Sequence, residues 1–374
     1  TYNRDSSRRI LVTKPLPGSD WLGLLIRSGF SVDVCTMPQP ILDEATLRLL
    51  LGERCEGVIG QLTENWGEEL FAALSRAGGK AYSNFAVGYN NVDVDAATRA
   101  GVAVGTTPGV LTETTAELAV ALVFAAARHT YEAEQFMRGG RYAGFLPQLF
   151  VGKRLRGSTL GVVGTGRIGQ AFARMMVEGH KMNLIYFSFH RNVALEDYVQ
   201  AYSAFLVSRG ESPLSVRRVA TVEELLCEAD VASLHVALSD DTLHLIDAPK
   251  LALMKPDAIL VNTARGPIVD EEALVAHLRT HPDFVAALDV FEREPLAAPG
   301  LLDLPNAVCL PHIGSATHWT RAGMAKLAAC NVLGALLGYP VFKENDVAAF
   351  VDASLDDVPK ACPSILNAEA LGME

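Results

Sequence analysis

The segment that most constrains the fold of this chain is a glycine-rich turn between an apolar run and a helical segment. The sequence TLGVV (159–163) has the composition of a buried strand, and GTGRIG follows it at residues 164–169. AFARMM then continues with helical spacing. In this strand–turn–helix context, the three glycines predict a dinucleotide-binding unit. A structural glycine turn without a ligand is the alternative interpretation.

Each glycine of this turn has a physical role in such a unit. Gly164 permits the tight turn, Gly166 lets the backbone approach a pyrophosphate, and Gly169 lets the helix and the strand pack closely. The N–H groups and the partial positive charge at the helix N-terminus would hold the phosphates. Arg167 and Ile168 belong to the same turn, so we count both among the cofactor-binding candidates.

Short apolar runs alternate with helical segments along nearly the whole chain. ILVTK (10–14) and EGVIG (56–60) have the composition of buried strands, and helical spacing is found at 44–51 and 67–77. This alternation predicts parallel sheets with helices on both faces. We therefore expect an α/β protein with two doubly wound parallel-sheet domains. One would be a Rossmann-type cofactor domain and the other a flavodoxin-like substrate domain, with a cleft between them.

The expected substrate domain comprises residues 1–117 and 318–374, and the dinucleotide-binding domain comprises residues 118–317. A long helix, with Thr114 and Glu117 spaced as a capping box, is predicted to connect the two. Its apolar residues cover most of the circumference, so we expect it to be buried all round between the domains. The segment 192–217 has mixed polarity and is interpreted as an insertion. The other expected elements are strands at 183–189, 230–235, 258–262, 284–290 and 307–311, and helices at 221–228, 271–279 and 319–337.

The composition restricts the possible partners. A net charge of -11 argues against a nucleic acid or an anionic membrane, because both require a basic face. The longest apolar run, 118–127, is too short to cross a bilayer. Hydrophobic residues make up 49% and charged residues 20%, as in ordinary soluble globular proteins. The six cysteines are scattered without a CxxC pair, so we expect buried free thiols, no metal site and an intracellular, reducing compartment.

The position that normally discriminates between nicotinamide cofactors holds Ser188. An acid usually stands about 20 residues after the glycines, where it binds the adenosine ribose and repels a 2′-phosphate. Ser188 removes that repulsion, and Arg191 could face the phosphate. Two alternatives remain open. Either NADP(H) binds through Ser188 and Arg191, or Ser188 bonds the ribose of NAD(H) while Arg191 points into solvent.

Three further motifs follow the late predicted strands, at the edge where ligands bind in such folds. They are NTARGPIVDEEAL (262–274), LDVFEREP (288–295) and LPHIGSAT (310–317). Together with GTGRIG they resemble the D-isomer-specific 2-hydroxyacid dehydrogenase family. GQLTENWGEELFAALSRAGGKAYSNFAVGYNNVDV, LFVGKRLRG and CPSILNAEALG resemble the plant-type hydroxypyruvate reductases, or glycerate dehydrogenases, within it. The resemblance covers nearly the whole chain.

By this resemblance Arg265, Glu294 and His312 are catalytic. Reduction of a 2-keto carboxylate needs a cation for the carboxylate and a proton donor for the carbonyl oxygen. Arg265 offers a rigid fork of donors, and His312 can exchange a proton near neutral pH. Glu294 would orient the imidazole and stabilise its protonated form. A structural ion pair, a solvated turn charge and a core histidine are the respective alternatives for the three.

The resemblance also implies contacts with the cofactor and the substrate. Asp289 matches the residue that holds the nicotinamide carboxamide. Ala86, Val87 and Gly88 would form a turn whose N–H groups bind the substrate carboxylate opposite Arg265. A plain strand-end Asp and a plain tight turn are the alternatives. The remaining cofactor contacts are expected at Thr115, Thr263, Ala264, Arg265, His312 and Ser315, and the substrate is also expected to contact His312.

The implied activity is reduction of hydroxypyruvate to D-glycerate by NADH or NADPH, with glyoxylate as a secondary substrate. A dehydrogenase for another small keto acid and a dinucleotide-sensing corepressor on the same fold are the alternatives. The resemblance further implies a homodimer, in which FLPQLF (145–150) could be an arm that reaches the partner subunit. It also implies an organelle, for which the peroxisome and the mitochondrion both remain open.

Overall fold

The computed structural model describes residues 1–344 and 346–373, and the chain divides into two compact units. Unit 1 is formed by residues 1–111 and by the segment from Ser315 onward, and unit 2 by residues 112–314. The sequence suggested boundaries after residues 117 and 317 instead. Each unit carries one parallel sheet and is described by itself.

The sheet of unit 1 has five parallel strands in the order β2-β1-β3-β4-β5. Leu11, Val58, Tyr82 and Val104 from four of the strands pack with α2, α3 and α4 in one core cluster. Helices α1 and α12 pack on each other, and α12 also contacts β3, β4 and β5. The elements are β1 (Arg9–Val12), α1 (Asp20–Arg27), β2 (Ser31–Val34), α2 (Glu44–Leu51), β3 (Gly57–Gly60), α3 (Glu68–Arg76), β4 (Ala81–Asn84), α4 (Val94–Arg99), β5 (Ala103–Gly105), α12 (His318–Leu337), α13 (Ala348–Val351) and the 3-10 helix η2 (Glu369–Leu371).

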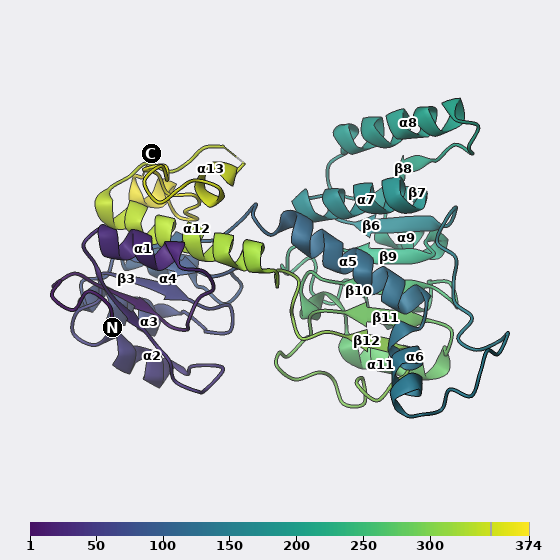
Figure 1. Ribbon diagram of the computed structural model, residues 1–374, viewed down its shortest axis with the longest axis horizontal. Helices are drawn as coiled ribbons and strands as arrows, with labels where there is room; N and C mark the ends of the chain where they lie inside the picture. Colours follow the sequence, from purple (N-terminus) through teal and green to yellow (C-terminus); the bar gives the residue numbers. More distant parts are fainter. Residues whose placement is uncertain (345, 374) are drawn as a thin grey trace. The chain divides into compact units, whose positions relative to one another are not determined.

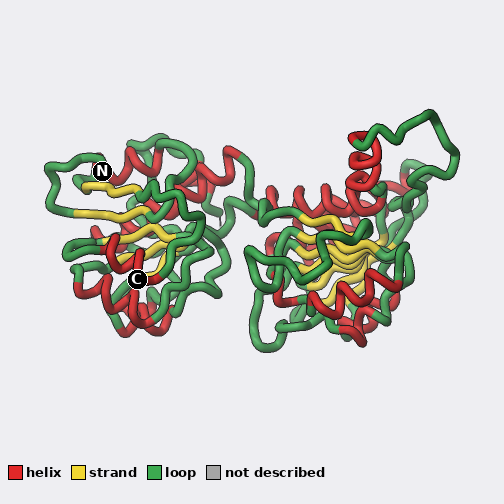
Figure 2. The backbone as a smooth tube through the Cα atoms, turned by 90° about the horizontal axis from the view of Figure 1, so that it is seen from below, coloured by secondary structure: helices red, strands yellow, loops and turns green. Residues whose placement is uncertain are grey.

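The sheet of unit 2 has seven parallel strands in the order β12-β11-β10-β9-β6-β7-β8. Figure 1 labels its elements, and Figure 2 shows the strands in yellow with helices in red around them. They are α5 (Thr112–Ala127), α6 (Thr130–Arg138), β6 (Thr159–Val163), α7 (Arg167–His180), β7 (Asn183–Phe187), α8 (Val193–Ser208), β8 (Val216–Arg218), α9 (Val222–Glu228), β9 (Val231–Leu234), α10 (Ala248–Leu251), β10 (Ile259–Asn262), the 3-10 helix η1 (Gly266–Ile268), α11 (Glu271–Thr280), β11 (Val285–Leu288) and β12 (Ala307–Cys309).

Two core clusters cover the two faces of the seven-stranded sheet. Successive side chains of a strand point to opposite faces. Val162 and Val261 therefore pack with α5 and α7, whereas Val163 and Leu260 pack with α9, α10 and α11. Because both faces are covered, the central strands β6, β9, β10 and β11 are almost continuously buried. The predicted fold class, α/β with parallel sheets, is confirmed.

Two details of the sequence analysis are wrong. Helix α5 begins at Thr112, so Thr114 lies inside the helix and cannot form the N-terminal capping box. Glu117 and Ala121 are exposed on α5, so this helix is not buried all round. It packs on α7 and on the sheet of unit 2.

The expected insertion is itself ordered. Most of the segment 192–217 forms α8, and Asn192 caps this helix by accepting a hydrogen bond from the N–H of Leu195 at 3.0 Å. The segment then reaches β8, which pairs with β7 at the edge of the sheet. Helix α8 packs against α7 and β8 (Figure 1).

Candidate active site

The backbone of the glycine-rich turn between β6 and α7 fits a phosphate group. Gly164 has a φ of +92°, and a Cβ there would lie 2.8 Å from the carbonyl oxygen of His235. A Cβ on Gly169 would lie 2.0 Å from the carbonyl oxygen of Gly164, so glycine is required for this close packing. At Gly166, the N-cap of α7, a Cβ would meet no atom within 4 Å. The space in front of the helix N-terminus is therefore open to an anion.

The two other predicted residues of this turn differ in their surroundings. Arg167 is the first residue of α7 and its side chain is exposed. Ile168 is half-buried and packs against the core cluster that contains α5 and α7. Its side chain therefore faces the protein, and what it can offer a phosphate is its backbone N–H.

His235 packs against the glycine-rich turn, because a Cβ on Gly164 would lie 2.8 Å from its carbonyl oxygen. Its ring packs on Phe172 with the centroids 5.0 Å apart, and its Nε2 shares a hydrogen bond of 2.8 Å with Oγ of Ser233. Burial of the ring lowers the pKa of His235 to about 3. The imidazole is therefore neutral under physiological conditions, and His235 is part of the packing beneath the turn.

The end of β7 carries Ser188, which is half-buried and whose hydroxyl hydrogen-bonds no described residue. The charge of Arg191 is already paired, because its Nη2 forms an ion pair of 2.6 Å with Glu196. Glu196 also accepts a hydrogen bond of 2.5 Å from the hydroxyl of Tyr186. The hydrogen bonds from Arg191 and Tyr186 hold the pKa of Glu196 below its ordinary value.

Arg218, which the sequence did not single out, lies against the same turn. It ends the edge strand β8, and its Nη2 donates to the carbonyl oxygens of Ser188 at 2.8 Å and Phe189 at 3.0 Å. No motif marks this residue in the sequence. Its position follows from the pairing of β8 with β7.

The segment after β10 positions Arg265 at the carboxyl edge of the sheet. Asn262 holds the turn, because its Oδ1 accepts from the N–H of Ala264 at 3.0 Å and its Nδ2 donates to the carbonyl of Arg265 at 2.8 Å. Nη1 of Arg265 donates to the carbonyl of Ala264 at 2.6 Å. Burial lowers the pKa of Arg265, and the nearby Glu294 carboxylate opposes that shift. The hydroxyl of Thr263 is buried without a hydrogen-bond partner among the described residues.

His312 and Glu294 are brought together from two different loops. Nδ1 of His312 lies 2.9 Å from Oε2 of Glu294, while Oε1 of Glu294 accepts from the N–H of Phe291 at 3.1 Å. His312 has a φ of +54°, and its N–H donates to the carbonyl of Asp289 at 2.9 Å. Burial would raise the pKa of Glu294, but the hydrogen bond from His312 and its charge bring that pKa below the ordinary value. The second ring nitrogen, Nε2, forms no hydrogen bond with a described residue.

Asp289 directly follows β11 and hydrogen-bonds the backbone that comes after His312. Its two carboxylate oxygens accept hydrogen bonds of 2.7 Å from the N–H groups of Ile313 and Gly314. Burial raises the pKa of Asp289 above its ordinary value, against the lowering effect of these N–H groups. Thr115 of α5 lies beside Gly314, because a Cβ on that glycine would lie 3.4 Å from Cγ2 of Thr115. Asp289 thus fixes the backbone that follows His312.

The predicted substrate loop, Ala86–Gly88, belongs to unit 1 and follows β4. None of its three N–H groups donates a hydrogen bond to a described residue. Asn84 holds the loop, since its Nδ2 donates to the carbonyl of Gly88 at 3.0 Å and to Oδ1 of Asn91 at 3.0 Å. Unpaired N–H groups in a fixed turn can receive a carboxylate. Ser315, a predicted cofactor contact, is also assigned to unit 1.

The comparisons with known proteins identify the family of the chain. Residues 120–314 match the NAD binding domain of the D-isomer specific 2-hydroxyacid dehydrogenases. The chain is 57% identical to a glycerate dehydrogenase from Cucumis sativus, over 99% of this chain and 97% of that protein. It is 55% identical to the peroxisomal glycerate dehydrogenase of Arabidopsis thaliana, over 100% of this chain and 96% of that protein. The chain belongs to the D-isomer specific 2-hydroxyacid dehydrogenase family.

A solved structure of the family supports the same assignment of the fold. The NADPH-dependent glyoxylate/hydroxypyruvate reductase of Sinorhizobium meliloti, crystallised with NADP and malonate, superimposes with a TM-score of 0.70 at 30% identity. The match covers 88% of this chain and 93% of that one. A nicotinamide dinucleotide is thus the cofactor of this dehydrogenase. The open turn at Gly166 and the unpartnered hydroxyl of Thr263 fit such a group.

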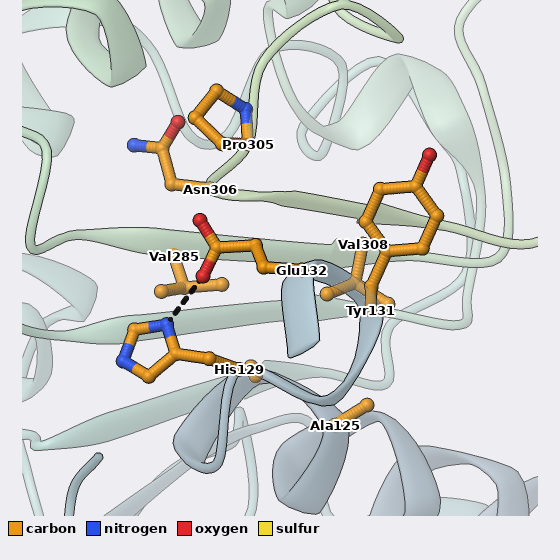
Figure 3. A pocket seen from close by; sticks show the side chains of 9 residues that line it. Ala125, His129, Tyr131, Glu132, Val285, Pro305, Asn306 and Val308 are labelled. Atoms are coloured by element: carbon orange, nitrogen blue, oxygen red, sulfur yellow. Dashed lines mark ion pairs between the residues drawn. The ribbon is translucent and has the colours of Figure 1, made fainter. Parts of the chain in front are cut away.

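A separate shallow pocket, open to solvent, lies where the end of α5 and the start of α6 meet β11 and β12 (Figure 3). His129 and Glu132 form an ion pair of 2.9 Å on its wall. Val285, the first residue of β11, also lines it. The pocket therefore lies at the amino end of β11, whereas Asp289 and His312 follow the carboxyl ends of the strands. It is not part of the candidate site.

Three further properties bear on the predicted partners. No helix in the described part of the chain is long and apolar enough to cross a membrane. Within residues 1–344 and 346–373 there is no group of three or more His, Cys, Asp or Glu that could hold a metal ion. All six cysteines are free thiols, and four are buried as expected, but Cys309 is half-buried and Cys227 is exposed.

Proposed function

We propose that this dehydrogenase reduces hydroxypyruvate to D-glycerate with a reduced nicotinamide dinucleotide, and glyoxylate to glycolate as a secondary reaction. The observation that carries this proposal is the His312–Glu294 pair with Arg265 within electrostatic reach of it. The glycerate dehydrogenases of cucumber and Arabidopsis, at 57% and 55% identity, support the choice of substrate.

His312 is the proposed acid of the reduction. Its Nδ1 is hydrogen-bonded to Glu294. Nε2 can therefore donate a proton to the carbonyl oxygen of the substrate as negative charge develops there. The anionic Glu294 stabilises the protonated imidazole before the reaction and fixes the orientation of the ring. In the reverse direction the same nitrogen accepts the proton of the hydroxyl group.

Arg265 is the proposed anchor and activator of the substrate. A guanidinium offers parallel donors to a carboxylate, and it also polarises a neighbouring carbonyl toward the charge of the transition state. The N–H groups of Ala86, Val87 and Gly88 are proposed to bind the same carboxylate from unit 1. Hydroxypyruvate and glyoxylate share this 2-keto carboxylate, which is why both are proposed as substrates.

The proposed cofactor contacts belong to unit 2, except for Ser315, which belongs to unit 1. The N–H groups at Gly166, Arg167 and Ile168 would hold the pyrophosphate, and Ser188 would contact the adenosine ribose. Thr115, Thr263, Ala264, Asp289 and Ser315 are proposed to contact the nicotinamide half. The bound reduced nicotinamide would supply the hydride. For the choice between NADH and NADPH, we favour NADPH, because Ser188 carries no charge that would repel a 2′-phosphate.

A steady-state experiment tests the proposal. The purified protein is mixed with hydroxypyruvate or glyoxylate and with NADH or NADPH, and the absorbance of the reduced nicotinamide is followed. We expect turnover with both acids and a higher kcat/KM for hydroxypyruvate. If neither reduced cofactor is consumed with either acid, the reductase proposal is wrong. A dehydrogenase for another small keto acid and a dinucleotide-sensing corepressor on the same fold would then be the remaining interpretations.

We also propose that the protein is a homodimer formed through α6 and the loop that follows it. No residue of α6 is buried, and large apolar side chains are exposed on this segment. Contiguous exposed apolar side chains usually mark an interaction surface. The side chains are Tyr131, Met137, Tyr142, Phe145, Leu146 and Val151.

For the compartment, we propose an organelle. The Arabidopsis relative is named as a peroxisomal protein. Expression of the full-length gene product as a fluorescent fusion, with peroxisomal and mitochondrial markers in parallel, tests the assignment. A diffuse distribution over the cytosol would contradict it.

A further inference from the structure

The guanidinium of Arg218 crosses from β8 to the end of β7. Nε and Nη2 donate to the carbonyl oxygen of Ser188 at 3.1 and 2.8 Å, and Nη2 also donates to that of Phe189 at 3.0 Å. In the strand register Arg218 is opposite Tyr186, so its side chain extends along β7 toward the carboxyl edge of the sheet. Nη1 of Arg218 hydrogen-bonds no described residue.

The positive charge of Arg218 is also less compensated than the charges of its neighbours. Arg191 is ion-paired with Glu196, and Arg217 is ion-paired with two glutamates of α9 at 2.5 and 2.6 Å. Arg218 is exposed and forms no ion pair with a carboxylate of the described chain. Glu196 lies within electrostatic reach of Arg218, but its side chain is only 8% exposed and is hydrogen-bonded to Arg191 and Tyr186.

We propose that Arg218, together with Ser188, binds the 2′-phosphate of NADP(H) and makes this the preferred cofactor. The inference rests on the proposed reductase function and assigns the residue that selects its cofactor. A guanidinium presents donors that match a phosphate, and an Arg beside the ribose position accommodates the 2′-phosphate in this type of fold. Ser188 adds a hydroxyl donor at the end of the strand. Arg191 contributes less, because its charge is paired with the carboxylate of Glu196, whereas Arg218 is hydrogen-bonded only to neutral carbonyl groups.

A binding experiment without nicotinamide or substrate tests the inference. Calorimetry compares adenosine 2′,5′-bisphosphate with adenosine 5′-monophosphate, which lacks the 2′-phosphate. We expect the bisphosphate to bind about 10- to 100-fold more tightly, the range of a charge-assisted hydrogen bond. Arg218→Gln is expected to remove most of this difference while the affinity for the monophosphate is retained. Arg217→Gln is the matched control, since that arginine is paired with α9, and it should leave both affinities unchanged.

A second variant covers the case in which Arg218→Gln fails to fold. Ser188→Asp is expected to weaken binding of the bisphosphate at least about 10-fold, because the new carboxylate repels the phosphate and pairs with Arg218. Binding of the monophosphate should be retained or strengthened.

Several outcomes would overturn the inference. These are equal affinities of the unaltered protein for the two nucleotides, an equal loss of both in Arg218→Gln, or the same loss in Arg217→Gln. Failure of the reductase proposal is distinguishable, because it appears as absent turnover with hydroxypyruvate. The nucleotide affinities are measured without any turnover.

Discussion

At the scale of single residues, the proposed chemistry depends on Nε2 of His312. Replacement by Ala is expected to lower kcat for hydroxypyruvate by about 10²- to 10⁴-fold, the contribution of a positioned general acid. The dissociation constant of the reduced cofactor, measured by its fluorescence, should stay near that of the unaltered protein. Turnover close to normal in His312→Ala would exclude His312 as the acid.

Glu294→Gln provides the matched comparison for this residue. The amide oxygen can still accept the hydrogen bond from Nδ1, so the orientation of the ring is retained, but the negative charge is lost. We therefore expect a smaller loss of kcat than in His312→Ala. Steady-state kinetics of both variants with hydroxypyruvate measure this difference.

Arg265, Glu294 and His312 were predicted from their motifs and the family resemblance, and the structure brings Glu294 and His312 to within 2.9 Å of each other. Arg218 and Asn84 were not predicted, and the physical reason is similar for both. Arg218 stands in RR, a pair of charges typical of any exposed strand, and Asn84 is one of several amides in SNFAVGYNN. Their roles arise from contacts with Ser188 and Gly88, and these contacts follow from the pairing of strands and the path of loops.

At the scale of elements, the glycine-rich turn offers a matched series of substitutions to Ala. Gly166→Ala should fold normally, since its Cβ meets no atom, but should bind NADPH much more weakly, because the pyrophosphate is proposed to occupy that space. Gly169→Ala should destabilise the fold, since its Cβ would lie 2.0 Å from the carbonyl oxygen of Gly164. Overpacking of this kind typically costs about 1–3 kcal/mol.

Gly179→Ala is the control in the same helix, where a Cβ also meets nothing within 4 Å. It should leave NADPH binding unchanged and raise the free energy of unfolding by about 0.5–1 kcal/mol, because Ala is favoured over Gly inside a helix. Thermal unfolding and fluorescence titration report the two properties separately. Normal binding in Gly166→Ala would show that the pyrophosphate does not lie against this turn.

The packing beneath the same turn makes stability depend on pH through His235. Its pKa is about 3 in the folded protein and near 6.5 in the unfolded chain, so the unfolded state binds the additional proton as the pH falls. The contribution is fully present above pH 6.5 and is lost progressively between pH 6.5 and about 3. Between pH 7.5 and 5 the expected loss is about 1–2 kcal/mol.

Denaturant unfolding at these two pH values tests this dependence. His235→Gln can still hydrogen-bond Ser233 but cannot be protonated, so its free energy of unfolding should fall less than that of the unaltered protein over the same interval. His277, whose pKa burial lowers to about 4, should contribute equally to both proteins. Identical pH dependence of the two proteins would contradict the assignment to His235.

The elements of unit 2 were predicted more fully than those of unit 1, and the composition of the strands explains the difference. β9 and β10 lie in the apolar segments DVASLH and AILVN, which were recognised, whereas β4 and β5 are equally buried but lack such segments. SVDV, AYSN and AVG form β2, β4 and β5 but are short and contain polar or small residues. Their strand conformation depends on pairing within the sheet and is not visible in local composition.

At the scale of the whole molecule, the fold class followed from the alternation of apolar runs and helices. This alternation did not predict the limits of the two compact units. The sequence of α5 is apolar along its length, and an apolar helix can pack on either unit. The contacts of α5 with α7, β10 and β11 assign it to unit 2 from Thr112 onward. The expectation of a capping box at Thr114 failed for the same reason, since a helix start depends on where tertiary contacts begin.

The proposed dimer is a property of the whole molecule, and its test depends on the loop after α6. Phe145 is 85% exposed and Leu146 is 60% exposed. Adjacent apolar side chains exposed in this way usually mark an interaction surface. In an interface of ordinary size such side chains become buried and contribute a large part of the binding free energy.

We expect the unaltered protein to sediment with twice the mass of the chain. The double variant Phe145→Glu and Leu146→Glu should sediment as a monomer, because two buried carboxylates would be unpaired. Leu49→Glu on α2, where the side chain is 82% exposed, is the control and should leave the dimer intact. A dimer in all three proteins would show that the interface lies elsewhere, and a monomer in the unaltered protein would exclude the dimer itself.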